Sequence, residues 1–172
     1  MDKRNIVLVG FMGTGKTTVG RLLSEKTGMP LVDMDALIEE RAGKSISDIF
    51  AQDGEPYFRI LERDMVRELA SGNGQIISTG GGIVLNPDNI TDFENSGIVV
   101  CLLADAETVL ERVRHGSNRP LLADDKEAKI KELLQSRKHL YESFAHKIDT
   151  NGRPSPEPTA QEIIDLYETN KP

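Results

Sequence analysis

A phosphate-binding loop is predicted near the N-terminus, where the chain reads Gly10-Phe11-Met12-Gly13-Thr14-Gly15-Lys16-Thr17. This run fits the pattern G-x-x-x-x-G-K-[ST], in which glycines let the backbone fold into a nest of N–H groups around phosphate oxygens. Lys16 would reach the β- and γ-phosphates, and the hydroxyl of Thr17 would bind Mg²⁺. The residues expected to bind the nucleotide here are Gly13, Thr14, Gly15, Lys16, Thr17 and Thr18.

The sequence on either side of this loop is that of a strand and a helix. An apolar run, Ile6 to Val9, precedes the loop, and Val19, Leu22 and Leu23 supply an apolar face after it. A helix that begins at the loop adds positive potential where phosphates bind. The alternative is a glycine-rich turn with an incidental lysine, but strand, loop and helix occur in the required order. The loop therefore predicts a nucleoside triphosphate site.

Two acidic residues, Asp33 and Asp35, lie at the end of a short predicted strand that begins at Leu31. In an open parallel sheet, ligands bind at the carboxyl ends of the strands. One carboxylate is expected to face the metal and its waters, and the other to face a hydroxyl group of the substrate. Either acid could instead cap the following helix, where negative charge is also favoured. Beside a phosphate-binding loop, we predict the functional roles.

Three consecutive glycines, Gly80, Gly81 and Gly82, follow the predicted strand at residues 75–78. Glycines in series permit close approach of the backbone to a ligand, with N–H groups directed at it. A flexible turn is the alternative interpretation. Because this strand ends at the same edge of the sheet, we predict that the glycines contact the substrate.

Two arginines, Arg59 and Arg137, lie on predicted helices and together would form a bidentate clamp for a carboxylate. Each has an alternative interpretation as a surface residue. For Arg59 that alternative is an ion pair with Glu62 on the same helix, worth at most a few tenths of a kcal/mol.

A third arginine, Arg119, lies in an irregular polar stretch at residues 115–125, which Arg112 and Arg114 precede. A mobile lid that carries an arginine adds charge at the transferred phosphoryl group when it closes, and closure also excludes water. A solvated loop arginine is the alternative. We predict that residues of about 113–125 form a lid and that Arg119 acts from it.

Strand and helix signals alternate along the whole chain, which indicates an α/β fold with a mostly parallel sheet. On the long helix after Pro56, Tyr57, Leu61, Met65 and Leu69 are predicted to form the buried stripe. Strands are expected at residues 6–9, 31–33, 75–78, 98–103 and 147–149, and helices at 16–27, 35–41, 45–50, 56–71, 87–95, 106–114, 126–145 and 159–168.

Composition favours a soluble globular protein. The 172 residues are 38% hydrophobic and 28% charged, without an apolar stretch of the roughly 20 residues that a membrane span needs. The net charge of −7 argues against a nucleic-acid surface. The single cysteine, Cys101, lies in an apolar run and is expected to be a buried thiol, so a reducing cytoplasm is the expected compartment. We expect one domain over 1–172 that acts as a monomer.

Taken together, these motifs resemble the shikimate kinase family in order and spacing over nearly the whole chain. The residues that carry the resemblance are 10–17, Asp33-Met34-Asp35, Gly54-Glu55, Phe58-Arg59, Glu62, Gly80-Gly81-Gly82, Arg119-Pro120-Leu121-Leu122, Arg137 and Tyr141. The phosphate-binding loop alone is generic, whereas the combination with the acids, arginines and glycines is specific.

The resemblance implies ATP-dependent phosphorylation of the 3-hydroxyl of shikimate, a step toward chorismate and the aromatic amino acids. It also implies a three-layer αβα P-loop fold with a five-stranded parallel sheet, a helical substrate-binding region at about 34–70 and a mobile lid. By family match, the residues that hold shikimate are Asp35, Arg59, Gly80, Gly81, Gly82 and Arg137.

On the donor side, the family match assigns the transferred phosphoryl group to Lys16 and Arg119, and Mg²⁺ to Thr17 and Asp33. Arg112 matches an arginine that packs on adenine. Arg153 lies in the variable adenine loop. Asp35 is either the catalytic base or a residue that positions the hydroxyl, and phosphoryl transfer depends mainly on positioning.

Two other classes of function fit part of this pattern. Another small-metabolite kinase of the same fold, such as a gluconate kinase, would also use arginines and Asp35 for a sugar acid. A nucleotide-gated binding module without turnover would need only the phosphate-binding loop. A nucleoside monophosphate kinase is disfavoured because the sequence has no second base-binding signature.

Overall fold

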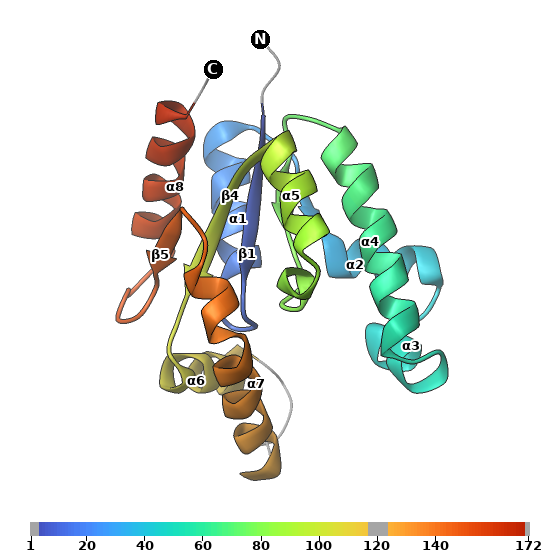
Figure 1. Ribbon diagram of the computed structural model, residues 1–172. Coiled ribbons are helices and arrows are strands. Elements are labelled where there is room, and N and C mark those ends of the chain that lie inside the picture. Colours follow the sequence, from blue (N-terminus) through green and yellow to red (C-terminus); the bar gives the residue numbers. More distant parts are fainter. Residues whose placement is uncertain (1–3, 117–123, 171–172) are drawn as a thin grey trace.

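A five-stranded sheet, parallel throughout, forms the centre of the computed structural model, which describes residues 4–116 and 124–170 (Figure 1). The strands lie in the order β2-β3-β1-β4-β5. Their bounds are β1 (Asn5–Gly10), β2 (Leu31–Asp33), β3 (Ile76–Ser78), β4 (Gly97–Leu103) and β5 (Lys147–Asp149). The predicted five-stranded parallel sheet is confirmed.

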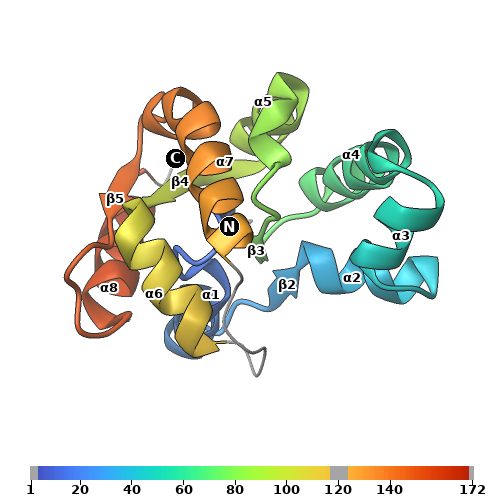
Figure 2. The same cartoon turned by 90° about the horizontal axis from the view of Figure 1, so that it is seen from below.

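Helices connect successive strands and lie on both faces of the sheet (Figures 1 and 2). Within the described residues they are α1 (Lys16–Thr27), α2 (Met34–Ala42), α3 (Ile46–Gln52), α4 (Glu55–Ser71), α5 (Pro87–Ser96), α6 (Ala106–Gly116), α7 (Asp124–Glu142) and α8 (Glu157–Thr169), with a 3₁₀ turn, η1 (Ile83–Leu85). Ser45 caps α3, since its hydroxyl accepts a hydrogen bond from Asp48 N at 3.1 Å. In these described segments, no helix is both long and apolar enough to cross a membrane.

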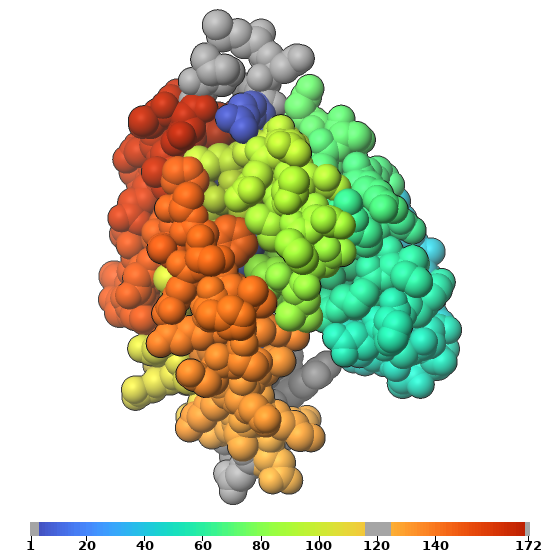
Figure 3. Space-filling model, in the orientation of Figure 1, coloured from blue at the N-terminus to red at the C-terminus, as the bar shows by residue number. Residues whose placement is uncertain are grey.

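The helices α2, α3 and α4 pack against one another to one side of the sheet (Figure 2). The space-filling view shows the surface hollowed between α7 and the α3–α4 region (Figure 3). The carboxyl end of β1 points toward this side of the molecule (Figure 1), and β2 and β3 run parallel to β1, so ligands of the predicted loops would enter here.

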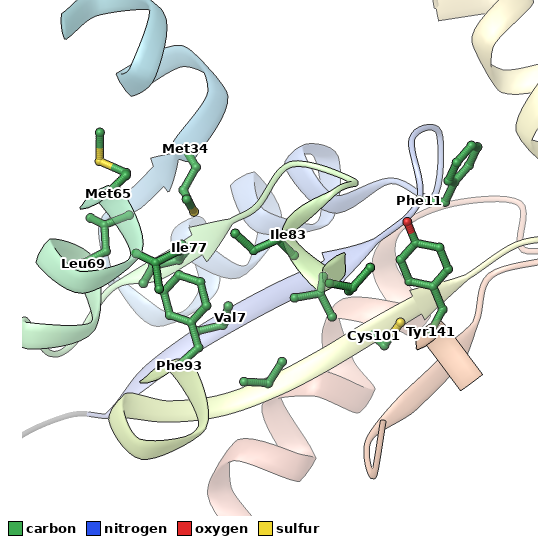
Figure 4. Close-up of a cluster of buried hydrophobic side chains, with 14 of the residues drawn as sticks. Val7, Phe11, Met34, Met65, Leu69, Ile77, Ile83, Phe93, Cys101 and Tyr141 are labelled. Atoms are coloured by element: carbon green, nitrogen blue, oxygen red, sulfur yellow. The ribbon is translucent and has the colours of Figure 1, made fainter. Parts of the chain in front are cut away.

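Two layers of apolar side chains hold the helices to the sheet. Alternate residues of β1 supply both layers. Val7 and Val9 join side chains of α2, α4, α5 and α7, and Figure 4 shows part of this layer. Ile6 and Leu8 join those of α1 and α8. Cys101 is fully buried in the first layer, as the sequence predicts. The layers establish the three-layer αβα arrangement.

One residue of the predicted stripe on α4 is wrong. Tyr57 is 43% exposed, whereas Leu61, Met65 and Leu69 pack in or against the core as predicted. The fully buried face of α4 consists of Phe58, Glu62, Met65, Val66 and Leu69. Both patterns share Met65 and Leu69, but a glutamate occupies the buried position one turn before them. A search for apolar residues at helical spacing leaves out Glu62, because glutamate is charged, and it therefore includes Tyr57 in the stripe.

Among the helix boundaries that differ from prediction by a few residues, two have a clear physical reason. Helix α7 ends at Glu142 rather than near residue 145, because Phe144 turns into the core and Lys147 Nζ donates to the Glu142 carbonyl at 2.9 Å. Helix α8 begins at Glu157, since Pro158 fits the first turn, where its missing N–H is not needed.

Candidate active site

The phosphate-binding loop has a backbone that only glycine permits at three positions. Gly10, Gly13 and Gly15 have φ values of 145°, 74° and 95°, in the left-handed half of conformational space. At Gly10 a Cβ atom would also lie 2.5 Å from the carbonyl oxygen of Leu102. Thr14 closes the turn, because its Oγ1 donates to Phe11 O at 2.8 Å. The loop therefore presents a preformed backbone nest at the start of α1.

Lys16 lies against this loop with only 9% of its surface exposed. Its Nζ donates to the carbonyl oxygens of Gly10 at 2.7 Å and Phe11 at 2.9 Å. Burial lowers the pKa of Lys16 to about 8, and the nearby charges of Asp35 and Asp33 oppose that shift. A buried ammonium group at the loop is suited to neutralise phosphate oxygens.

This pKa predicts how ATP affinity depends on pH. The Lys16 side chain is cationic below pH 8 and neutral above it, so nucleotide binding above pH 8 must take up a proton. The Kd for ATP, measured by calorimetry at saturating Mg²⁺, is expected to rise by up to about tenfold per pH unit above 8 and to change little from pH 6.5 to 7.5. Lys16→Met is the control and lacks this rise, whereas an equal rise in both proteins would contradict the assignment.

Thr17, Asp33 and Ser78 bring three side-chain oxygens together beside the loop. Thr17 Oγ1 donates to Asp33 Oδ2 at 3.1 Å and lies 3.3 Å from Ser78 Oγ. Asp33 Oδ1 accepts from Ala36 N at 3.2 Å, so the same carboxylate caps α2 and faces the loop. The capping interpretation of Asp33 is therefore confirmed, and its role at a metal stays a prediction. A hydroxyl beside a carboxylate fits Mg²⁺, a hard cation that binds few protein oxygens and several phosphate or water oxygens.

Ser78 was not among the predicted site residues. It is 2% exposed and is the last residue of β3, an otherwise apolar strand. That change from apolar to polar at a strand end was the available signal.

Asp35 lies in the first turn of α2, next to the glycine loop. Burial raises the pKa of Asp35, the charge of Asp33 raises it further, and Lys16 opposes both. A Cβ atom on Gly80 would lie 2.8 Å from Asp35 Oδ1, so Gly80 leaves the space that this carboxylate occupies. Asp35 is thus a partly desolvated hydrogen-bond acceptor between the two loops.

Arg59 is held by an ion-pair network rather than lying free on the surface. Its guanidinium donates to Glu62 Oε1 at 2.9 Å and to Glu55 Oε1 at 3.0 Å, and lies 5.2 Å from the centre of the Phe58 ring. Glu62 is only 2% exposed, so the predicted alternative of a surface ion pair is wrong for that partner. A Cβ atom on Gly82 would overlap the Arg59 guanidinium.

Arg137 lies on α7 and joins this group across the molecule. Burial raises the pKa of Glu62, while the charges of Arg59 and Arg137 oppose the rise and Asp35 adds to it. The charges of Arg59, Arg137 and Asp35, from helices α4, α7 and α2, therefore all act on one buried carboxylate. Glu62 offsets part of the positive charge and orients Arg59, while leaving guanidinium N–H groups for an anionic ligand.

The close fit of Gly82 against Arg59 predicts a selective defect. Gly82 has φ −89°, which alanine adopts without strain, so Gly82→Ala is expected to fold normally but to displace the guanidinium. The KM for the acceptor is expected to rise about tenfold, since small misplacements of a clamp weaken it strongly. The KM for ATP is the comparison and is expected to stay near the parental value, because the three atoms nearest to the added Cβ all belong to Arg59. An unchanged KM in Gly82→Ala would contradict this account of Arg59.

A separate pocket adjoins the loop on the side of α8. Its lining consists of Thr14, Gly15, Thr18, Val19, Arg112, Thr150, Arg153, Ser155, Pro156 and Thr159. Arg112 spans it, donating to Gly13 O at 3.2 Å and Thr150 O at 2.8 Å. Arg153 donates to Thr159 Oγ1 at 3.2 Å and pairs with Glu162 at 3.0 Å. The predicted nucleotide residues Thr18, Arg112 and Arg153 thus share one pocket.

The predicted lid falls largely beyond the part of the chain that the structure describes. Residues 117–123 lie outside it, and Arg119 with them. The remaining predicted site residues are all described.

Comparisons with known proteins identify the family. The family model for shikimate kinase matches residues 12–168. Shikimate kinases from Thermodesulfovibrio yellowstonii and Pelotomaculum thermopropionicum are 45% and 47% identical, over 96% and 86% of this chain and 95% and 86% of their own. The structure of a shikimate kinase from Acinetobacter baumannii in complex with shikimate matches with a TM-score of 0.87 at 40% identity, covering 98% of this chain and 95% of that one. The chain therefore belongs to the shikimate kinase family.

Proposed function

We propose that this chain transfers the γ-phosphoryl group of ATP to the 3-hydroxyl of shikimate, giving shikimate 3-phosphate and ADP on the route to chorismate. The observation that carries the proposal is the group formed by Arg59, Arg137 and Asp35 beside the loop that holds Lys16. It pairs a site for a small hydroxylated carboxylate with a site for a triphosphate.

On the acceptor side, the two arginines bind the carboxylate of shikimate and Asp35 accepts a hydrogen bond from a hydroxyl group. Gly80 and Gly82 leave the space that Asp35 and Arg59 occupy, and Gly81 lets the backbone approach the substrate closely. As a carboxylate, Asp35 positions the acceptor oxygen for in-line attack. Burial also raises the pKa of Asp35, which makes this carboxylate a better acceptor for the proton of that hydroxyl.

On the donor side, the pocket beside α8 takes the adenine and the loop takes the phosphates. Thr17 and Asp33 would hold Mg²⁺, and the ion would neutralise negative charge on the phosphates. Lys16 and Arg119 bind the oxygens of the transferred group. Charge neutralisation and alignment account for most of the catalysis in this class of reaction.

The domain organisation, compartment and oligomeric state are part of the same proposal. The chain acts as one domain over 1–172, with residues of about 34–70 on the acceptor side and about 113–125 closing over the nucleotide. We propose a cytoplasmic monomer with no nucleic-acid partner. The acidic balance of 28 Asp and Glu against 21 Lys and Arg supports the last point.

The test is an ADP-release assay with ATP, Mg²⁺ and a panel of acceptors. We expect turnover with shikimate and none with gluconate or nucleoside monophosphates, and mass spectrometry of the product is expected to show one added phosphoryl group. Turnover on gluconate with none on shikimate would favour the sugar-acid kinase. Binding of ATP without turnover on any acceptor would favour a nucleotide-gated binding module.

A further inference from the structure

Tyr141 connects three parts of the proposed active site that are distant in sequence. It lies on α7, is 3% exposed, and its hydroxyl donates to the carbonyl oxygen of Gly81 at 2.6 Å. Its ring meets that of Phe11 edge to face, with centroids 6.3 Å apart and planes at 72° (Figure 4). Arg137, one turn earlier on the same helix, interacts with the same hydroxyl.

The bond to Gly81 constrains the glycine loop where it is intrinsically least rigid. A peptide unit is planar and trans, so its N–H points opposite to its carbonyl. Fixing the Gly81 carbonyl toward α7 therefore fixes the direction of the Gly82 N–H as well. Three glycines in series have many accessible backbone conformations. The carbonyls of Gly80 and Gly82 accept from Ile83 N at 3.2 Å and Leu85 N at 3.1 Å, and the Tyr141 hydroxyl holds the carbonyl between them.

The hydroxyl also restrains Arg137. A long arginine side chain loses considerable rotamer entropy when it binds a ligand, and an acceptor that holds it beforehand reduces this loss. Tyr141 can serve both partners, because a phenol donates one hydrogen bond, here to Gly81, and accepts from a cation. One side chain thus orders both the clamp and the loop.

We propose that Tyr141 is a positioning residue of the acceptor site: its hydroxyl aligns the Gly81–Gly82 peptide and Arg137 for the substrate, while its ring braces the phosphate-binding loop through Phe11. This inference rests on the proposed function, since it assumes that Arg137 and the glycine loop bind the acceptor. Removing the hydroxyl of a core tyrosine that only stabilises the fold would change the KM values of both substrates or of neither.

Tyr141→Phe separates these roles, because it keeps the ring and removes only the hydroxyl. Tyr167→Phe is the matched control: Tyr167 is also buried and its hydroxyl also donates to a backbone carbonyl, that of Arg4 at 3.1 Å, but it lies on α8. We expect the KM for shikimate to rise about five- to tenfold in Tyr141→Phe only, with kcat within about threefold and the KM for ATP within about twofold of the parent.

A double-variant cycle tests the path through Arg137. Tyr141→Phe is expected to raise the KM for shikimate less in an Arg137→Ala background than in the parent, since part of its effect passes through that arginine. Two results would overturn this inference: an unchanged KM for shikimate in Tyr141→Phe, or an equal rise in the KM values for shikimate and ATP. In either case, turnover of shikimate by the parent protein would leave the proposed function intact. A parent with no turnover on shikimate would instead overturn the proposed function and this inference with it.

Discussion

Lys16→Ala is expected to lower kcat by about 10²–10³-fold, the usual effect of losing one preorganised group that stabilises transition-state charge. The Nζ atom is already held at the mouth of the loop by two carbonyl oxygens and is desolvated. Negative charge on the transferred oxygens is felt more strongly in such a setting than in water. The initial rate of ADP release at saturating ATP, Mg²⁺ and shikimate measures this loss.

Folding is expected to change much less than turnover in this variant. Burial disfavours the charged form of Lys16, so alanine removes an unfavourable desolvation together with two hydrogen bonds. The control is Lys26→Ala on the same helix, whose ammonium is exposed and paired with Glu157 at 3.2 Å. That variant is expected to keep parental kcat. Parental turnover in Lys16→Ala would exclude Lys16 from the mechanism.

The parts of the site that depend on local sequence were the most predictable. The loop at 10–17 and the turn at 80–82 need particular backbone conformations or free space, and glycine is the residue that provides them. The Asp33 carboxylate shows the limit of such reasoning. Capping and metal binding are alternative interpretations of this residue in the sequence, yet its two oxygens allow one carboxylate both to cap α2 and to face Thr17.

The parts that depend on packing were less predictable. Glu62 looks like a surface partner of Arg59 because both lie at helical spacing, and only the packed structure places it in a buried position near Arg137 and Asp35. The same burial moves the apolar stripe of α4 away from Tyr57. A charged residue on a buried face gives no periodic signal, because periodicity counts apolar residues. The contact of Tyr141 with Gly81 joins residues 60 apart and is equally invisible in the sequence.

The second large effect is expected at Arg59. Arg59→Ala is expected to weaken shikimate binding by about 1.5–3 kcal/mol, the range for a hydrogen bond to a charged group, which is about 10- to 150-fold in KM. The KM for ATP is expected to stay close to the parental value, because Arg59 lies on α4 with the acceptor group. An unchanged KM for shikimate would contradict the clamp.

The structure adds a stability effect with a defined pH dependence. Alanine leaves the buried Glu62 carboxylate without its ion-pair partner Arg59. Because the Arg59 side chain is 26% exposed, we expect the free energy of unfolding to fall by about 1–3 kcal/mol, less than for a fully buried pair. The pKa of Glu62 is already raised by burial, and removal of Arg59 raises it further. An acid with a raised pKa in the folded state binds more protons there than when unfolded. The free energy of unfolding therefore falls as pH rises above about 4.3, the unfolded value.

These two effects of Arg59→Ala can be separated with a second substitution. In Arg59→Ala/Glu62→Gln, the buried group is neutral, so the free energy of unfolding is expected to recover most of its loss and the added pH dependence to disappear. The KM for shikimate is expected to remain high, because the guanidinium that binds the carboxylate is still absent. Denaturant unfolding at pH 5 and pH 8 and steady-state kinetics at the same two values provide both measurements. If the double variant regained the parental KM, Arg59 would act on shikimate only by neutralising Glu62, and the carboxylate clamp would reduce to Arg137.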